Sequence, residues 1–138
     1  MRRVWVGLGV AIMAAVWGMG AQNVHAAADQ EAARPEFYTT KVKPILQANC
    51  YRCHSGMNHR GGLTLSTKAG ILKGGKDGVV LVPGNPASSF LVKLIRHEGP
   101  ANNPRPMPPR GKLSDADIAT VERWVRAGGI MPDDAPVR

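Results

Sequence analysis

Apolar side chains recur at helical spacing in three parts of the 138-residue chain. The first part spans residues 36–48, the second spans residues 88–97, and the third lies between Ser114 and Gly128. Each part carries one apolar stripe, which is the pattern of a helix that packs one face against a core. Pro44 lies inside the first part and predicts a kink or a restart of the helix there. The chain is therefore expected to fold as a small, mainly α-helical domain.

The third helix has the clearest start and end signals. Ser114 is a good N-cap, and Asp117 follows three residues later, as in a capping box. Leu113 and Ile118 are placed for a hydrophobic staple across the cap. A Gly-Gly pair at residues 128–129 predicts the end of the helix.

The chain between the first and last helices is rich in glycine and proline. Residues 55–87 contain repeated glycines, which favour loops and short extended pieces, and a brief strand is predicted at Val79–Val82. The helix at 88–97 is expected to start at a serine cap. Residues 102–112, N-N-P-R-P-M-P-P-R-G-K, contain four prolines and suit neither a helix nor an inner strand. These features predict a loop-rich middle between two terminal helices.

The beginning of the chain has the pattern of an export signal. Two arginines precede an uncharged apolar run over residues 4–21, and residues 24–26 (Val-His-Ala) fit a cleavage site. This predicts a secretory signal peptide over residues 1–26, and an uncleaved membrane anchor is the alternative. Both interpretations place the following domain outside the cytoplasm. The remaining chain divides into a flexible lead-in (27–35), a folded domain (36–131) and a C-terminal tail (132–138).

The formal net charge of the chain is +8, and its basic residues are spread along the sequence. Nucleic-acid-binding surfaces are usually denser in Lys and Arg, and export also argues against that role. A positive face that docks an acidic partner protein is one interpretation of the charge. An ordinary solvated basic surface is an equally good one.

Both cysteines of the chain lie in one short motif, Cys50-Tyr51-Arg52-Cys53-His54. The pattern C-x-x-C-H is typical of covalent haem attachment. Two thiols in this order bond to the two vinyl groups of the porphyrin, and the adjacent imidazole ligates the iron from one side. The sequence therefore predicts one c-type haem held by Cys50, Cys53 and His54.

Three other uses of the motif are weaker. A disulfide oxidoreductase normally carries its C-x-x-C within a βαβ pattern, and the flanking sequence does not have that pattern. A structural zinc site needs four ligands, but Cys50 and Cys53 combined with His59 and His97 match no common zinc spacing. A plain disulfide across two intervening residues would close a loop too small to constrain the chain much.

The iron position opposite the motif's histidine needs a second ligand or stays open. Met57 and His59 follow the motif too closely to reach around the ring. Met131 lies in the tail, where chain ends tend to be mobile, and His97 suits a helix end. Met107 is bracketed by prolines in N-P-R-P-M-P-P-R-G, which favours a stiff strap that loses little entropy on holding a thioether against iron. An exposed linker with an incidental methionine is the alternative.

Together these segments resemble the planctomycete-type cytochrome c domain, over residues 37–130. The resemblance implies a small cytochrome c-like fold in which the N- and C-terminal helices pack together around a covalent haem. It also implies that Met107 is the distal ligand of the haem iron. The matching segments are Phe37, V-K-P-I-L (42–46), C-Y-R-C-H (50–54), G-G-L-T-L (61–65), G-G (74–75), P-G-N-P-A-S-S (83–89), M-P-P (107–109) and L-S-D-A-D-I-A-T-V-E-R-W-V-R-A-G-G (113–129).

The expected function is that of an exported monohaem electron carrier, in the periplasm or another extracytoplasmic space. With His54 and Met107 both on the iron, substrate has no free position, so an enzyme is not expected. The expected partners are redox proteins with an acidic docking face, and a membrane only if residues 1–26 remain uncleaved. Two alternatives stay open, namely an open-site haem protein that binds or senses gas or peroxide, and a haem-bearing relay subunit of a redox enzyme complex.

Overall fold

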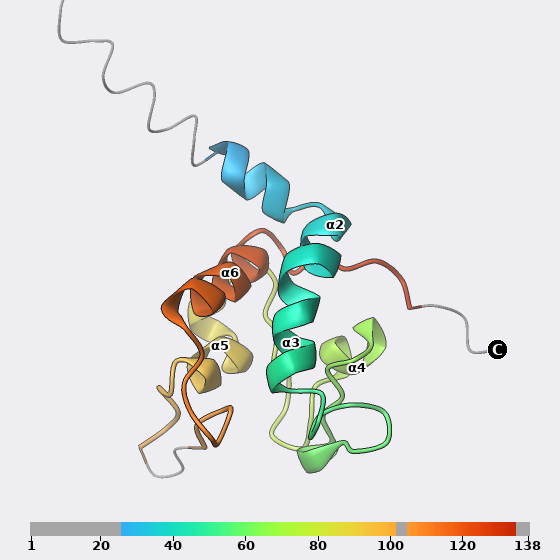
Figure 1. Cartoon of the computed structure of the whole chain (residues 1–138), viewed down its shortest axis with the longest axis vertical. Helices are drawn as coiled ribbons and strands as arrows, with labels where there is room; N and C mark the ends of the chain where they lie inside the picture. The colour runs from blue at the N-terminus through green and yellow to red at the C-terminus, as the bar shows by residue number, and fades with distance from the viewer. Residues whose placement is uncertain (1–25, 102–104, 135–138) are drawn as a thin grey trace, which may run out of the picture.

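The structure, a computed structural model, describes residues 26–101 and 105–134. Its regular elements are helices, which confirms the predicted mainly α-helical fold (Figure 1). Apart from its last residue, the predicted signal segment lies outside the described residues. In chain order the elements are α2 (Pro35–Phe37), a π-helical turn (Tyr38–Val42), α3 (Lys43–Asn49), a 3-10 turn (Arg60–Gly62), α4 (Lys68–Lys73), a 3-10 turn (Pro86–Ser88), α5 (Phe90–Ile95) and α6 (Asp115–Arg126).

The N-terminal helix changes its winding just before Pro44. α2 continues into the π-helical turn, and α3 begins at Lys43. Pro44 has no backbone N–H, so the regular hydrogen bond to the preceding turn cannot form at this residue. A wider turn absorbs the mismatch, as π-bulges commonly do. The predicted kink or restart at Pro44 is therefore confirmed.

The chain before α2 differs from the loose lead-in predicted for residues 27–35. Residues 26–32 are helical, and the side chain of Ala32 is fully buried in the core. The alanines of this stretch favour a helix, and burial of one of them ties it to the domain. Within the described ranges, no helix is long and apolar enough to cross a membrane.

α6 begins and ends as its sequence predicts. The hydroxyl of Ser114 accepts a hydrogen bond from the backbone N–H of Asp117 at 3.1 Å and donates to its carboxylate at 2.8 Å. Leu113 and Ile118, the predicted staple, are both buried. After Arg126 the chain turns through two glycines with positive φ. Local capping thus sets the ends of this helix, and its apolar stripe faces inward.

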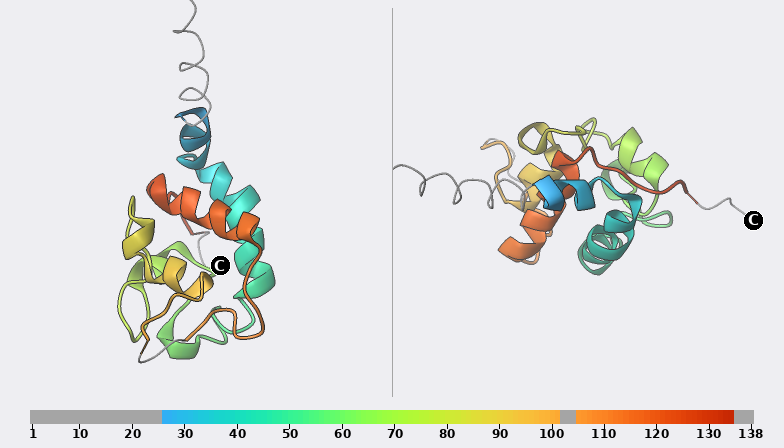
Figure 2. Two further views of the ribbon diagram at one scale, coloured as in Figure 1. Left: turned by 90° about the vertical axis from the view of Figure 1, so that its left-hand side faces the viewer. Right: turned by 90° about the horizontal axis from the view of Figure 1, so that it is seen from above.

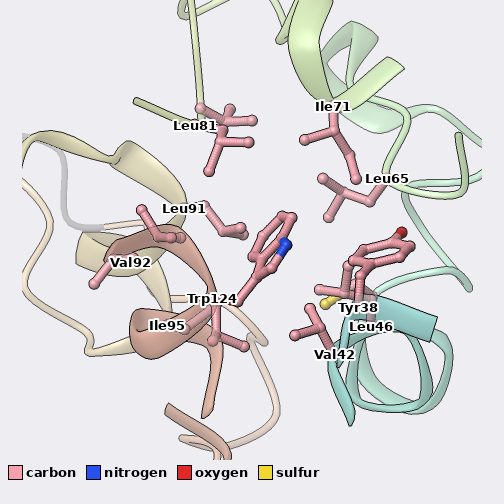
Figure 3. Packing of buried hydrophobic residues seen from close by; sticks show 14 of the residues in the cluster. Tyr38, Val42, Leu46, Leu65, Ile71, Leu81, Leu91, Val92, Ile95 and Trp124 are labelled. Atoms are coloured by element: carbon pink, nitrogen blue, oxygen red, sulfur yellow. The ribbon is translucent and has the colours of Figure 1, made fainter. Parts of the chain in front are cut away.

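Trp124 of α6 is the centre of the core (Figure 3). Its indole is fully buried, and the ring centroid lies 5.4 Å from that of Tyr38 in the N-terminal helix. The indole N–H donates to the carbonyl of Ile130 at 2.8 Å, which satisfies its one polar atom. α6 therefore packs across the N-terminal helix, as expected from the resemblance (Figure 2).

The brief strand predicted at Val79–Val82 does not form. The β-structure of the described residues consists of isolated β-bridges. The side chains of Val80 and Leu81 are buried, which explains the apolar pattern. The backbone finds its partners at the start of α5 instead of in a second strand. The carbonyl of Val80 accepts from Leu91 N–H at 2.9 Å, and the Val82 N–H donates to the Ser89 hydroxyl at 2.9 Å.

The predicted serine is at the cap position of the second helix, but its hydroxyl does not cap that helix. Ser89 occupies the N-cap position of α5, but its side chain makes no capping hydrogen bond to that helix. It is fully buried and donates instead to the carbonyl of Asn85 at 2.9 Å. Ser89 therefore fastens the preceding loop to the core, and α5 starts without a side-chain cap.

The chain after α6 returns to the domain and closes the start of α4. The carboxylate of Asp134 accepts from the backbone N–H groups of Lys68 at 2.6 Å and Ala69 at 2.9 Å. Asp133 also pairs with the Lys68 ammonium at 2.8 Å. An acidic side chain at a helix start satisfies free N–H groups and opposes the helix dipole. The first residues of the predicted tail are thus part of the packed structure.

Gly129→Ala should destabilise the protein by about 2 kcal/mol, because an L-residue is strained at positive φ and a buried contact is overpacked. The residue has φ +64°, and an added Cβ would lie 2.9 Å from a methyl carbon of the buried Leu81. Thermal unfolding followed by circular dichroism measures the loss. Gly56→Ala is the control, since its Cβ would meet nothing within 4 Å. Equal melting temperatures for the two variants would contradict the packing of Gly129.

Candidate functional site

The four residues predicted to bind haem line a single cavity of about 280 Å³. Cys50, Cys53 and His54 come from the turn after α3, and Met107 comes from a proline-rich strap, defined here as residues 105–111. The volume is close to the lower end of the roughly 300–1,000 Å³ typical of ligand pockets. The apolar lining is supplied by Leu63, Leu65, Val80, Phe90, Leu91, Leu94, Ile95, Pro108 and Pro109.

The cysteine motif is a tight turn built directly on the end of α3. The N–H of Cys50 donates to the carbonyl of Leu46 at 2.8 Å, which continues the helical pattern by one residue. The carbonyl of Cys50 then accepts from the N–H groups of Cys53 at 3.0 Å and His54 at 2.9 Å. This turn brings both thiols and the imidazole to the same cavity. The orientation of α3 therefore sets the position of all three groups.

The two thiols have different surroundings. Both are free, but Cys50 is buried whereas Cys53 is partly exposed. Burial raises the pKa of the Cys50 thiol to about 11, with a smaller contribution from the neighbouring Cys53. Cys50 is therefore protonated at neutral pH and lies as a neutral thiol against an apolar wall. An apolar environment of this kind suits a sulfur atom that forms an uncharged thioether bond.

The imidazole of His54 has an unsatisfied nitrogen. Its Nδ1 is buried and has no hydrogen-bond partner among the described residues. Buried polar atoms in folded proteins nearly always have a partner, so an orphan of this kind requires an explanation. A metal ion could supply the missing partner, since either nitrogen of a neutral imidazole can ligate one. The donor set of two thiols, an imidazole and a thioether around an apolar cavity thus fits a covalently held haem.

Met107 reaches the cavity because its strap is fastened to α5. The Met107 N–H donates to the carbonyl of Leu94 at 3.1 Å, close to the end of that helix. Pro108 and Pro109, which follow directly, also line the cavity. The methionine is partly buried, so the alternative of an exposed linker with an incidental methionine is not what the structure shows.

The competing second ligands lie elsewhere. Met57 is 99% exposed on a loop, and neither His59 nor His97 lines the cavity. Met131 was expected in a mobile chain end, but the structure buries its side chain in the hydrophobic core. The physical reason is the return of the chain after α6, which buries Met131 in the core cluster, and Met131 does not line the cavity. Of these candidates, Met107 alone faces the motif.

The alternative sites for the two cysteines also find no support in the described part of the chain. Cys50 and Cys53 are not joined in a disulfide there. In residues 26–101 and 105–134, no three or more side chains of His, Cys, Asp or Glu are grouped so that they could hold a metal ion. Cys50 and Cys53 are therefore not gathered with His59 into a zinc site.

One part of the cavity wall is charged, and the sequence analysis did not predict that these residues line the cavity. Arg60, Lys76, Asp77 and Arg105 all line the cavity. Arg105 lies two residues before Met107, so its position in the strap was the available signal. Arg60 and Lys76 come from the glycine-rich loops, whose folding the sequence pattern does not specify.

A larger groove of about 590 Å³ runs along α5 and α6 but contains none of the predicted site residues. It surrounds an ion pair in which Arg96 contacts both carboxylate oxygens of Glu122, one of them at 2.8 Å. The hydrogen bonds that Arg96 donates to Glu122 raise the pKa of the guanidinium above its usual value. The ion pair satisfies the largely buried carboxylate of Glu122. The charged residues of this groove therefore have a structural role.

Residues 50–111 match the family of planctomycete cytochrome C. This confirms the resemblance predicted from the sequence, and the matched segment contains the cysteine motif, Met107 and the charged cavity wall. The match indicates a haem-binding domain that transfers electrons. Neither the curated proteins nor the solved structures yielded a significant match to the chain.

In full-length protein produced without haem, Cys53 should be alkylated before Cys50, because Cys50 is buried. Alkylation of Cys50 should accelerate as the pH rises toward about 11, since the thiolate is the reactive form. Peptide mass spectrometry after brief iodoacetamide treatment at several pH values measures both rates. A helical circular dichroism spectrum is the control for folding. Equal rates at both cysteines in helical protein would contradict this arrangement.

Proposed function

Because residues 50–111 match the planctomycete cytochrome C family, we propose that the protein is an exported monohaem c-type cytochrome that carries electrons. The observation that carries the proposal is the single cavity lined by the C-x-x-C-H motif and by Met107. These residues are more than fifty positions apart in the sequence, and they supply the complete set of groups that a six-coordinate c-type haem requires.

Each of the four residues has a distinct role in the proposal. Cys50 and Cys53 hold the porphyrin through thioether bonds, and His54 supplies the proximal ligand of the iron. Met107 supplies the distal ligand. The bound haem provides an iron that changes between the ferric and ferrous states. The cysteine motif continues α3 and the strap is bonded to α5, so these residues would hold the haem with little rearrangement of the protein between the two states.

The surroundings of the cavity favour electron transfer over catalysis. A methionine opposite the histidine leaves substrate no free iron position and gives a higher reduction potential than two histidines would. The largely apolar lining would limit the access of water to a bound haem and so the solvent reorganisation that accompanies oxidation and reduction. The proposed role is therefore that of a carrier and not of an enzyme.

The proposed location and partners rest on the sequence. An N-terminal segment with the features of a signal peptide supports export to the periplasm or another extracytoplasmic space. Without Arg2 and Arg3 of the predicted signal peptide the formal net charge is +6, which supports steering toward redox partners with an acidic docking face. A transient interface of this kind is small and depends on ionic strength.

Ferric protein matured in an exporting host should show a c-type spectrum that survives denaturation, together with the weak far-red band of methionine-ligated haem. Met107→Leu should abolish that band, because leucine has no thioether sulfur. Met131→Leu is the matched control, since Met131 lies in the core and a volume-conserving change there is tolerated. Absorption spectra of the three proteins decide the point. A band that persists in Met107→Leu would refute the ligand assignment.

Carbon monoxide distinguishes the carrier from the open-site alternative. Wild-type ferrous protein should bind CO slowly or not at all, because Met107 must leave the iron first. Met107→Leu should bind CO rapidly, since its distal position is open. Stopped-flow absorption after mixing with CO measures both rates. Rapid binding by the wild type would favour a gas- or peroxide-binding protein instead of a carrier.

A further inference from the structure

The charged wall of the cavity is a compact cluster drawn from three parts of the chain. Among the described residues that line the cavity, the charged side chains are Arg60, Lys76, Asp77 and Arg105. The Lys76 N–H donates to the carbonyl of Gly61 at 2.8 Å, which joins the two glycine-rich loops. Asp77 accepts from Arg105 Nη1 at 2.9 Å, which joins the second loop to the strap. These contacts join the three segments that carry the charged residues of the cavity lining.

Arg105 has more donors than its partner can use. A guanidinium carries five N–H donors, and the contact with Asp77 involves only Nη1. Its Nε is buried and has no hydrogen-bond partner among the described residues. A buried donor of a charged group is rarely left without an acceptor, and an anionic oxygen is its strongest one. The structure thus holds a fixed guanidinium with unused donor capacity at the cavity wall.

The charge of the cluster points to the same kind of ligand group. Three cationic side chains and one carboxylate leave a net charge of +2 on an otherwise largely apolar cavity. Arg60, Lys76 and Asp77 are exposed to solvent, whereas Arg105 is partly buried, so its charge is screened least. Asp77 orients the guanidinium but neutralises only part of the positive charge. The wall is therefore complementary to an anion inside the cavity.

We propose that Arg105 binds a propionate carboxylate of the haem, with Lys76 and Arg60 supplying the remaining positive charge. This inference rests on the proposed function, because it assigns a role toward the same haem. A haem carries two carboxylates, which match the net charge of the cluster. The planar guanidinium suits a carboxylate better than an ammonium group does, because it offers two parallel N–H donors.

The position of Arg105 gives this contact a second consequence. Arg105 and Met107 lie on the same strap, which is fastened to α5 by the hydrogen bond from the Met107 N–H to Leu94. A carboxylate bound to Arg105 holds the strap at a second point, two residues from the proposed iron ligand. Arg105 is therefore a positioning residue for Met107 as well as a partner for the carboxylate.

The contact also affects the reduction potential. A cation that pairs with the carboxylate reduces the negative charge near the iron, and negative charge stabilises the ferric state. Removing the guanidinium should therefore favour the ferric state and lower the midpoint potential. In a largely apolar site the redox equilibrium should shift about three- to tenfold. A tenfold shift corresponds to ~59 mV for one electron.

The test compares Arg105→Gln with Arg110→Gln in haem-loaded protein. Arg110 lies on the same strap, but it is exposed and does not line the cavity. Spectroelectrochemical titration should give a lower midpoint for Arg105→Gln and less than a ~2-fold shift in the redox equilibrium for Arg110→Gln, whose charge is screened by solvent. Arg105→Lys retains the charge without the planar fork and should lie between the wild type and Arg105→Gln.

Redox-induced infrared difference spectra give the second readout. The carboxylate bands of the haem should shift in Arg105→Gln and stay unchanged in Arg110→Gln. Equal midpoints and equal carboxylate bands in the two variants would overturn this inference while leaving the carrier intact. A wild type without covalent haem would overturn both this inference and the proposed function. The Arg105 and Arg110 variants therefore test this inference, whereas the wild type tests the proposed function.

Discussion

The packing of Trp124 against Tyr38 is the contact on which the rest of the structure depends. It fixes α6 across the N-terminal helix, and that helix runs through the π-helical turn into α3. Because Cys50 continues the hydrogen-bond pattern of α3, the position of this helix determines where the thiols and the imidazole lie. A core contact between the N-terminal helix and Trp124, which lies about seventy residues after the motif, therefore positions the chemistry of the site.

α5 serves both the core and the cavity. Leu91 and Ile95 are buried in the core cluster and also line the cavity, and the carbonyl of Leu94 holds the strap. Residues that stabilise the fold are thus the same residues that shape the site. A change in the packing of α5 would alter the distance between the strap and the cysteine motif, so stability and redox properties are physically coupled.

The cavity combines an apolar interior with polar groups from opposite ends of the matched segment. The cysteine motif enters from the end of α3, whereas the strap carries a thioether and a guanidinium only two residues apart. In a largely apolar cavity, a partly buried polar group has a larger electrostatic effect than it would have on the surface. The protein can therefore adjust the properties of a bound haem with a small number of side chains.

The sequence determined the local features of this protein. It identified the helical class, the caps of α6, the break at Pro44 and the residue types of the site, because each depends on neighbours a few positions away. Only the tertiary structure decided that Met131 is a core residue and that Val80 bonds to α5 without a second strand. It also decided that the buried Nε of Arg105 has no partner among the described residues. These features depend on contacts between distant segments, and such contacts follow from packing in three dimensions, which local periodicity and spacing do not specify.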